Sequence, residues 1–360
     1  MISWLKRAAQ TRTRVDNAAA MDKERREGLH LAQRNLCAIL LAVQLLLWLA
    51  LYCYDRQRQS SWQSALLALL PLGVLAVLWY YAAKKGPLAG GRAFAGLLLI
   101  PCLWLDVFFC MAGCVSLLEY YIPSFPFYGR LLMVTVFPLA TAWLSRSRGI
   151  AYGLYPLKYF LLIAFALSTV LSGADVSPAR LQPLAVLPLP AMGQGLYAAA
   201  GAVWPVCLLF LLPGMQGPEG KSRRWIFLLI PVALMLIWAL WMCMLRPWQP
   251  GDALVPAQKL TAISQYSGNM IMSQLGTLLW TTALPAAILG SVYAACRLLA
   301  AALPRCPSAF FPAVVILPAA ALLLLPAQTL TRWMDILLPL RWVPALAAGL
   351  LLLLMPGKER

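Results

Sequence analysis

Long apolar runs recur along this 360-residue chain, and they constrain its fold more than any other feature. Runs near 20 residues have the length that an α-helix needs to cross the hydrocarbon core of a bilayer. Only 11% of the residues are charged, against roughly 25% in a typical soluble domain. The sequence therefore predicts an all-α, polytopic membrane protein whose spans are helices.

The apolar runs define about ten spans in a single membrane domain, which a basic tail precedes. We expect the tail over residues 1–28 to be cytoplasmic, where it is either solvated or in contact with anionic lipid. The integral membrane domain covers residues 29–356, with a first half at about 31–172 and a second half at about 190–355. The predicted spans are 31–53, 63–83, 94–118, 131–145, 150–172, 190–213, 225–245, 271–300, 309–326 and 334–355.

The positions of the basic residues predict the orientation of these spans. The formal net charge of +17 does not indicate nucleic-acid binding, because the lysines and arginines lie between the apolar runs. With the N-terminus inside, 21 of the 29 fall in inner segments and eight, including Arg332 and Arg341, in outer segments. This bias predicts that both termini are cytoplasmic. Five spans in each half would give two halves of opposite orientation, which is the inverted-repeat layout of many transporters.

The predicted span at 190–213 contains residues that weaken a helix. Gly193, Gly195, Gly201 and Pro205 lie within it, at depths where no water replaces a lost backbone hydrogen bond. Interrupted spans of this kind often form the central site of secondary transporters, whereas a kinked packing helix is the alternative. Its place as sixth of ten spans, opening the second half, favours a discontinuous helix.

A series of motifs surrounds this span. Asp175 in an outer loop is followed by Leu181-Gln182-Pro183, by the glycine-bearing span with Pro205, and by Leu212-Pro213. This order resembles the membrane permease subunit of bacterial spore germination nutrient receptors, which belongs to the amino acid/polyamine/organocation transporter superfamily. Other segments that resemble the family are Gln33 to Gln44, Trp62 to Ala68, Arg148-Gly149-Ile150 (the turn before its fifth span) and Asn269 to Tyr293.

The resemblance covers about residues 30–355 and implies a 5+5 inverted-repeat fold. It also implies a location in the spore inner membrane and other germinant-receptor subunits as partners. The chain departs from the family pattern in its first span, where Gln44 to Trp48 contains no glycine and predicts a continuous helix. After Pro205, Val206 and Cys207 stand where the family places a glycine and an acid. A basic residue usual in the eighth span is missing.

Asp106 is the only acidic residue deep in a predicted span. A carboxylate in lipid is costly, so it should face the protein interior. It is either a partner for a ligand amine and a proton carrier, or a structural hydrogen-bonding residue. Lys158 lies in the fifth span, where the superfamily resemblance implies an amine in place of a sodium ion; the alternative is a lysine that snorkels to the membrane surface.

Several further residues are polar, aromatic or helix-breaking at mid-span and are expected to line a central substrate site. Freed backbone groups at the interrupted span would hydrogen-bond a small zwitterion there. Each residue alone is more often a helix–helix contact. The predicted substrate-binding residues are Gln44, Asp106, Gly201, Trp204, Pro205, Trp280, Thr281 and Thr282.

No enzyme motif emerges, because the chain has no P-loop, HExxH or GxSxG sequence. His30 is the only histidine and the nine cysteines are scattered, so we expect no metal and no cofactor. The first functional hypothesis is a receptor-type permease that senses a small nutrient, such as an amino acid. A proton-coupled amino acid or amine transporter and a structural membrane subunit that binds no ligand are the alternatives. The expected partners are the lipid bilayer, the nutrient and other receptor subunits.

Overall fold

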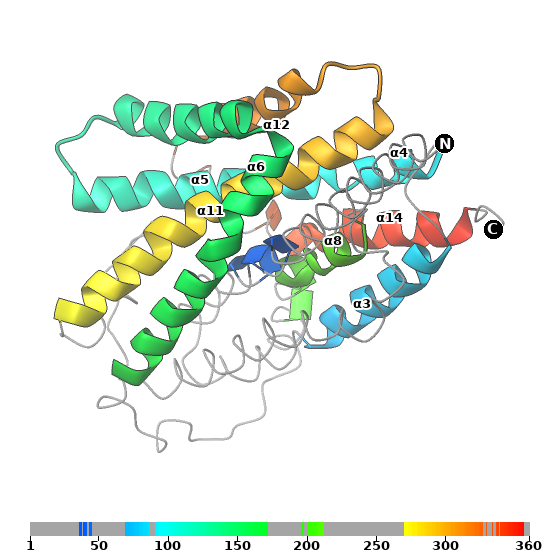
Figure 1. Ribbon diagram of the computed structural model, residues 1–360, viewed down its shortest axis with the longest axis horizontal. Coiled ribbons are helices and arrows are strands. Elements are labelled where there is room, and N and C mark those ends of the chain that lie inside the picture. The colour runs from blue at the N-terminus through cyan, green and yellow to red at the C-terminus, as the bar shows by residue number, and fades with distance from the viewer. Residues whose placement is uncertain are drawn as a thin grey trace, which may run out of the picture.

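The fold is known from a computed structural model, and the described backbone is helical with short turns and contains no strand. The all-α prediction is thereby confirmed for this part of the chain, whose helices form one bundle (Figure 1). The described residues are 36–37, 39–41, 43–44, 69–85, 91–171, 196–197, 200–211, 270–326, 329, 333, 336–337 and 339–355. The elements are α3 (Leu69–Lys84), α4 (Gly91–Leu97), α5 (Ile100–Tyr121), α6 (Phe127–Leu171), α8 (Val206–Leu211), α11 (Met270–Ala302), the 3₁₀ turn η5 (Ser308–Phe310), α12 (Phe311–Leu322) and α14 (Trp342–Leu354).

Among the described residues, three helical stretches are long and apolar enough to cross a membrane. They are Arg92–Glu119, Phe127–Leu144 and Trp280–Ala302, and they coincide with the predicted third, fourth and eighth spans. The shorter helices α3, α12 and α14 are also apolar and overlap the predicted second, ninth and tenth spans. The basic tail, the segments 173–190 and 246–269 that lie between predicted spans, and the predicted span 225–245 are outside the described residues.

Helix α11 is the central element of the bundle, and it packs against both α5 and α6 (Figure 1). Small residues permit the close approach. A Cβ atom on Gly113 of α5 would lie 3.0 Å from Leu284 of α11, and one on Gly290 would lie 3.0 Å from Leu40 of the first predicted span. The outer side of α6 is different, because large apolar side chains such as Leu132 and Phe137 are exposed there, as expected for a surface that faces lipid.

A tight hairpin joins α5 to α6. The expected loop over 119–130 shortens to Ile122–Pro126, since α5 continues to Tyr121 and α6 begins at Phe127. An ion pair closes the hairpin, with Arg130 Nη1 3.2 Å from Glu119 Oε2. The hairpin fixes the register of the two helices at this end of the bundle.

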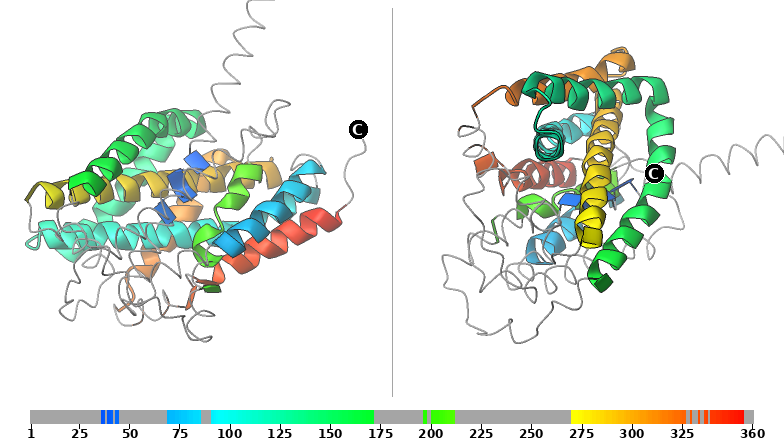
Figure 2. Two further views of the ribbon diagram at one scale, coloured as in Figure 1. Left: turned by 90° about the horizontal axis from the view of Figure 1, so that it is seen from below. Right: turned by 90° about the vertical axis from the view of Figure 1, so that its left-hand side faces the viewer.

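Helix α6 differs from the prediction of two spans joined by a turn. It runs through 45 residues, and the expected turn at Arg148–Ile150 is helical. A single glycine in a helix costs only about 1 kcal/mol relative to alanine, which does not terminate it. Pro138 and Pro156 lie inside the helix and remove backbone donors, and α6 changes direction sharply between its two halves (Figure 2). One bent helix therefore covers the residues that we predicted to form two separate spans, 131–145 and 150–172.

Helices α3 and α14 lie side by side at the other side of the bundle (Figures 1 and 2). The indole Nε1 of Trp79 in α3 donates to the carbonyl of Ala345 in α14 over 3.1 Å. The two backbones approach closely at Gly349, where a Cβ atom would lie 2.7 Å from Leu78 Cδ2. These contacts hold α3 tightly against α14.

Candidate functional site

Asp106 lies in the middle of α5 and is completely buried. Cys102 and Cys110 precede and follow it at four-residue intervals, so the three side chains share one face of the helix. All other residues within three positions are apolar, and α5 carries no other acidic residue before Glu119. The carboxylate therefore needs partners from other helices.

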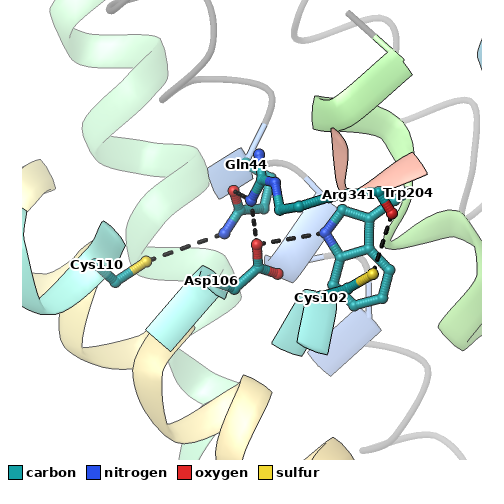
Figure 3. A network of polar contacts seen from close by, with 6 residues as sticks. All are labelled: Gln44, Cys102, Asp106, Cys110, Trp204 and Arg341. Atoms are coloured by element: carbon teal, nitrogen blue, oxygen red, sulfur yellow. Dashed lines mark hydrogen bonds and ion pairs between the residues drawn. The ribbon is translucent and has the colours of Figure 1, made fainter. Parts of the chain in front are cut away.

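Arg341 supplies the main partner. Its guanidinium is 1% exposed, and its Nη1 forms an ion pair with Oδ1 of Asp106 and donates to Oε1 of Gln44 over 2.8 Å (Figure 3). The planar ring of Phe109 lies beneath the guanidinium, 5.4 Å from its central carbon. The assignment of Arg341 to an outer segment is thus wrong. A buried carboxylate stabilises an arginine in the interior that would otherwise remain at the surface.

The backbone at Arg341 is itself irregular. Pro339 and Leu340 are helical, Arg341 is a turn residue, and α14 begins at Trp342. Pro344 explains the interruption, because it has no N–H to donate to the carbonyl of Leu340, four residues earlier. The Sγ of Cys102 lies 3.0 Å from the Arg341 carbonyl and donates to it. The interruption thus places both the side chain and the backbone of Arg341 against α5.

The structure has a two-residue turn at the predicted place in the sixth span, within an apolar helical stretch that runs from Ala200 to Leu211. Residues 200–203 are helical, Trp204 and Pro205 form a turn, and α8 starts at Val206. The amide of Cys207 donates to the Trp204 carbonyl over 3.0 Å, which is a tighter turn than an α-helix makes. Pro205 cannot donate to Gly201, so the α-helical ladder is broken at this point.

The turn residue Trp204 joins the same network. Its indole Nε1 lies 3.3 Å from Oδ1 of Asp106 and donates to it (Figure 3). Gln44 completes the cluster from the first predicted span, with its Nε2 4.0 Å from the Sγ of Cys110, a long and weak contact. Arg341 and Trp204, each at a helix interruption, thus contact the Asp106 carboxylate of α5, and Gln44 joins the cluster through Arg341.

One polar atom of this cluster has no hydrogen bond. Oδ2 of Asp106 is buried and has no partner among the described residues, whereas Oδ1 accepts from both Arg341 and Trp204. Leaving a buried acceptor unsatisfied costs about 1–3 kcal/mol, and more for a charged group. The site therefore has capacity for one more donor at Oδ2, such as a ligand N–H or a proton.

The remaining predicted site residues lie at the turn in the sixth span and on α11. Gly201 and Pro205 are buried at the turn, and Trp280 is buried in α11. Thr281 is exposed, and its hydroxyl donates to the Leu278 carbonyl over 3.2 Å. Thr282 donates to the same carbonyl over 2.7 Å. Both threonines thus bond to their own helix, as mid-helix threonines commonly do.

Two predictions at this site lie beyond what the structure describes. Lys158 is a residue of α6, but its side chain is outside the described part, so its predicted role in ion or proton coupling stays a prediction. The expected continuity of the first span from Gln44 to Trp48 lies outside the described residues after Gln44. In the described part, no group of three histidine, cysteine, aspartate or glutamate side chains is arranged to hold a metal ion.

Sequence reasoning identified Asp106, Trp204 and Gln44 but missed Arg341 and Cys102. A signal for Arg341 was present, since it lies inside the predicted span 334–355, where an arginine requires a partner. The four-residue spacing of Cys102, Asp106 and Cys110 was the signal for the cysteines. Comparisons with the models of known protein families and with curated proteins find no match to this chain.

Proposed function

We propose that this chain is a receptor-type permease subunit of a membrane, which binds a small zwitterionic nutrient such as an amino acid at Asp106 and Arg341. The observation that carries the proposal is the buried ion pair between these two side chains, placed against the interruption at Trp204-Pro205. A carboxylate and a guanidinium at one site complement the two charges of an amino acid. Buried ionisable residues in a membrane domain most often mark such a site.

In the proposed mechanism, the ligand exchanges one ion pair for two. The ligand ammonium takes the place of the guanidinium at Asp106, where the unpartnered Oδ2 accepts one of its three donors. The ligand carboxylate then pairs with Arg341, whose planar fork matches it with two parallel hydrogen bonds. No buried charge is left alone at the end of the exchange, so the large cost of an isolated buried ion is avoided.

The helix interruptions supply the movement that the exchange requires. Separation of Arg341 from Asp106 needs a shift of a turn residue at the start of α14, and Trp204 also lies at a turn. Turns between packed helix segments absorb changes of backbone angle more easily than helix interiors do. Ligand binding would thus shift the population between a closed packing with the ion pair and an open packing with the ligand.

The larger assembly is part of the proposal. We infer a domain of ten spans with two inverted halves and both termini cytoplasmic, as in the spore germination permeases that the sequence resembles. In that setting the chain lies in the spore inner membrane with other receptor subunits, and it senses the nutrient rather than transporting it. The three membrane-length helices and the interrupted sixth span support this arrangement.

Ligand-induced stabilisation of the purified full chain in detergent tests the binding proposal. The thermal unfolding midpoint is measured with each common amino acid and with N-acetyl and carboxamide analogues, which each lack one charge. A free amino acid at about 100 times its Kd should stabilise the folded state by about 2.7 kcal/mol. The analogues should not. Stabilisation by none of the amino acids would favour a structural subunit without a ligand.

Proton-coupled transport is a second candidate, and the unpartnered Oδ2 of Asp106 favours it. A proton on this oxygen would neutralise the carboxylate and weaken its ion pair with Arg341, and its release on the other side would couple to transport. Uptake of labelled amino acid into proteoliposomes with an imposed pH gradient separates the two candidates. Gradient-dependent uptake that Asp106→Asn abolishes would establish the transporter, whereas binding without uptake supports the receptor.

A further inference from the structure

A cavity elsewhere in the bundle shares no lining residue with the proposed nutrient site. It has a volume of about 750 Å³ and opens between α6, α11, η5 and α12. Its walls are mostly aromatic and aliphatic. The lining includes Trp143, Tyr293, Arg297, Ala300, Phe310 and Phe311.

Arg297 is the only charged residue that lines this cavity among the described residues. Its Nε is buried and has no hydrogen-bond partner in the described part of the chain. A guanidinium has five N–H donors and cannot lose its charge. The unpartnered Nε–H of Arg297 therefore calls for an acceptor of negative charge. No carboxylate of a described residue lines the cavity, so the described part of the chain does not provide that acceptor there.

The cavity lies toward one end of the membrane-length stretch Trp280–Ala302, since Arg297 is in its last two turns. Trp143 lines the cavity from α6. Tryptophan is enriched at this depth, where its ring is apolar and its N–H is hydrogen-bonded. Here Trp143 Nε1 donates to the Ala309 carbonyl over 2.7 Å, which fixes the rim of the cavity.

The mouth of the cavity is flanked by apolar side chains that water would solvate poorly. Trp143 is 53% exposed and Phe310 is 64% exposed. A ligand with a phosphate beside Arg297 and a hydrocarbon chain beside Phe310 would bond the unpartnered Nε of Arg297 and also cover the apolar side chains at the mouth. Free phosphate would satisfy only the arginine.

We propose that this cavity binds one phospholipid with a net anionic headgroup. The lipid phosphate accepts hydrogen bonds from Arg297, and the glycerol and upper acyl chains lie along Phe310 and Phe311. Basic pockets between membrane helices are known to select anionic headgroups. Arg305 lies at the same end of the molecule but is exposed and does not line the cavity.

The test measures retained lipid on the full-length chain in maltoside detergent by native mass spectrometry. Phosphatidylglycerol and phosphatidylcholine are added in turn, and wild type is compared with Arg297→Gln and with the matched control Arg305→Gln. Wild type and Arg305→Gln should retain one phosphatidylglycerol in preference to phosphatidylcholine. Arg297→Gln should weaken phosphatidylglycerol binding about tenfold or more, because a charge-assisted contact is lost.

A second variant and a competitor make the result decisive. Ala300→Trp narrows the cavity without a change of charge and should also weaken lipid retention, which covers the case in which Arg297→Gln fails to fold. Inorganic phosphate at millimolar concentration should not displace the lipid. Four results would each overturn the proposal. Two concern charge: wild type retains the two lipids equally, or Arg297→Gln and Arg305→Gln lose the same amount of phosphatidylglycerol. The other two are unchanged retention in Ala300→Trp and displacement of the lipid by inorganic phosphate.

Discussion

Arg341 and Asp106 are 235 residues apart in the chain, and their side chains form an ion pair inside the helical bundle. The pair joins α5, in the first third of the sequence, to the turn before α14 near its C-terminal end. A buried pair of this kind holds distant segments in register, because separating them leaves two charges without partners. The folding of the described core and the proposed binding of a ligand thus depend on the same contact.

Removal of one partner of this pair should destabilise the protein strongly. Asp106→Asn or Arg341→Met alone should cost about 3–5 kcal/mol, since each leaves a buried polar group or charge uncompensated. The double variant should cost much less than the sum of the two single variants. Unfolding in mixed detergent micelles measures these free energies. Glu119→Gln is the control, because it breaks a partly exposed pair with Arg130 and should cost only about 0–1 kcal/mol.

Trp204→Phe should separate ligand binding from general stability. The substitution keeps most of the buried ring but removes the donor to Asp106, so it should cost about 1.5–3 kcal/mol and alter amino acid binding. Trp79→Phe is the matched control, because it removes an equally buried indole donor to the Ala345 carbonyl. Trp79→Phe should lower the unfolding midpoint without a change in ligand affinity. An equal effect of both variants on affinity would contradict a direct role of Trp204.

Two helical glycines should respond in opposite ways to alanine. Nothing lies within 4 Å of a Cβ atom on Gly73 in α3, so Gly73→Ala should stabilise the protein by up to about 1 kcal/mol through helix propensity. A Cβ atom on Gly349 would approach Leu78 Cδ2 to 2.7 Å and Trp79 Nε1 to 3.2 Å. Gly349→Ala should therefore lower the unfolding midpoint. A gain of stability in both variants would contradict the close packing of α3 on α14.

The cysteines should report the closed state of the site. Cys306 is exposed and should react quickly with N-ethylmaleimide, whereas Cys102 and Cys110 are buried beside Asp106 and should be protected. Mass spectrometry of digested protein gives the modified fraction at each position. Opening by a bound amino acid analogue should raise the reaction of Cys102 and Cys110 and leave Cys306 unchanged. Fast reaction of all three without ligand would contradict the buried arrangement.

The sequence predicted those features that follow from local chemistry. Apolar length identified α5 and α11, and the cost of a buried carboxylate identified Asp106. The interruption at Trp204-Pro205 was predicted because Pro205 lacks an N–H and lies in an apolar run. Each of these signals depends on residues that are neighbours in the chain.

The features that the sequence did not predict depend on distant contacts or on small local energies. The inward position of Arg341 depends on its pairing with Asp106 and Gln44, which no local pattern reveals. Helix α6 continues past Gly149 because a glycine in a helix costs only about 1 kcal/mol relative to alanine, and tertiary packing outweighs this cost. Counting charges between spans treated every arginine as a surface residue, and that assumption failed at Arg341.

The most direct test of the proposed function is a binding cycle between the ligand ammonium and Asp106. Affinities of an amino acid and its N-acetyl analogue are measured by calorimetry on wild type and on Asp106→Asn. Wild type should bind the amino acid at least about tenfold more tightly than the analogue, and Asp106→Asn should bind the two almost equally. The same preference for the free amine in both proteins would contradict the assignment of Asp106 and Arg341 as the ligand site.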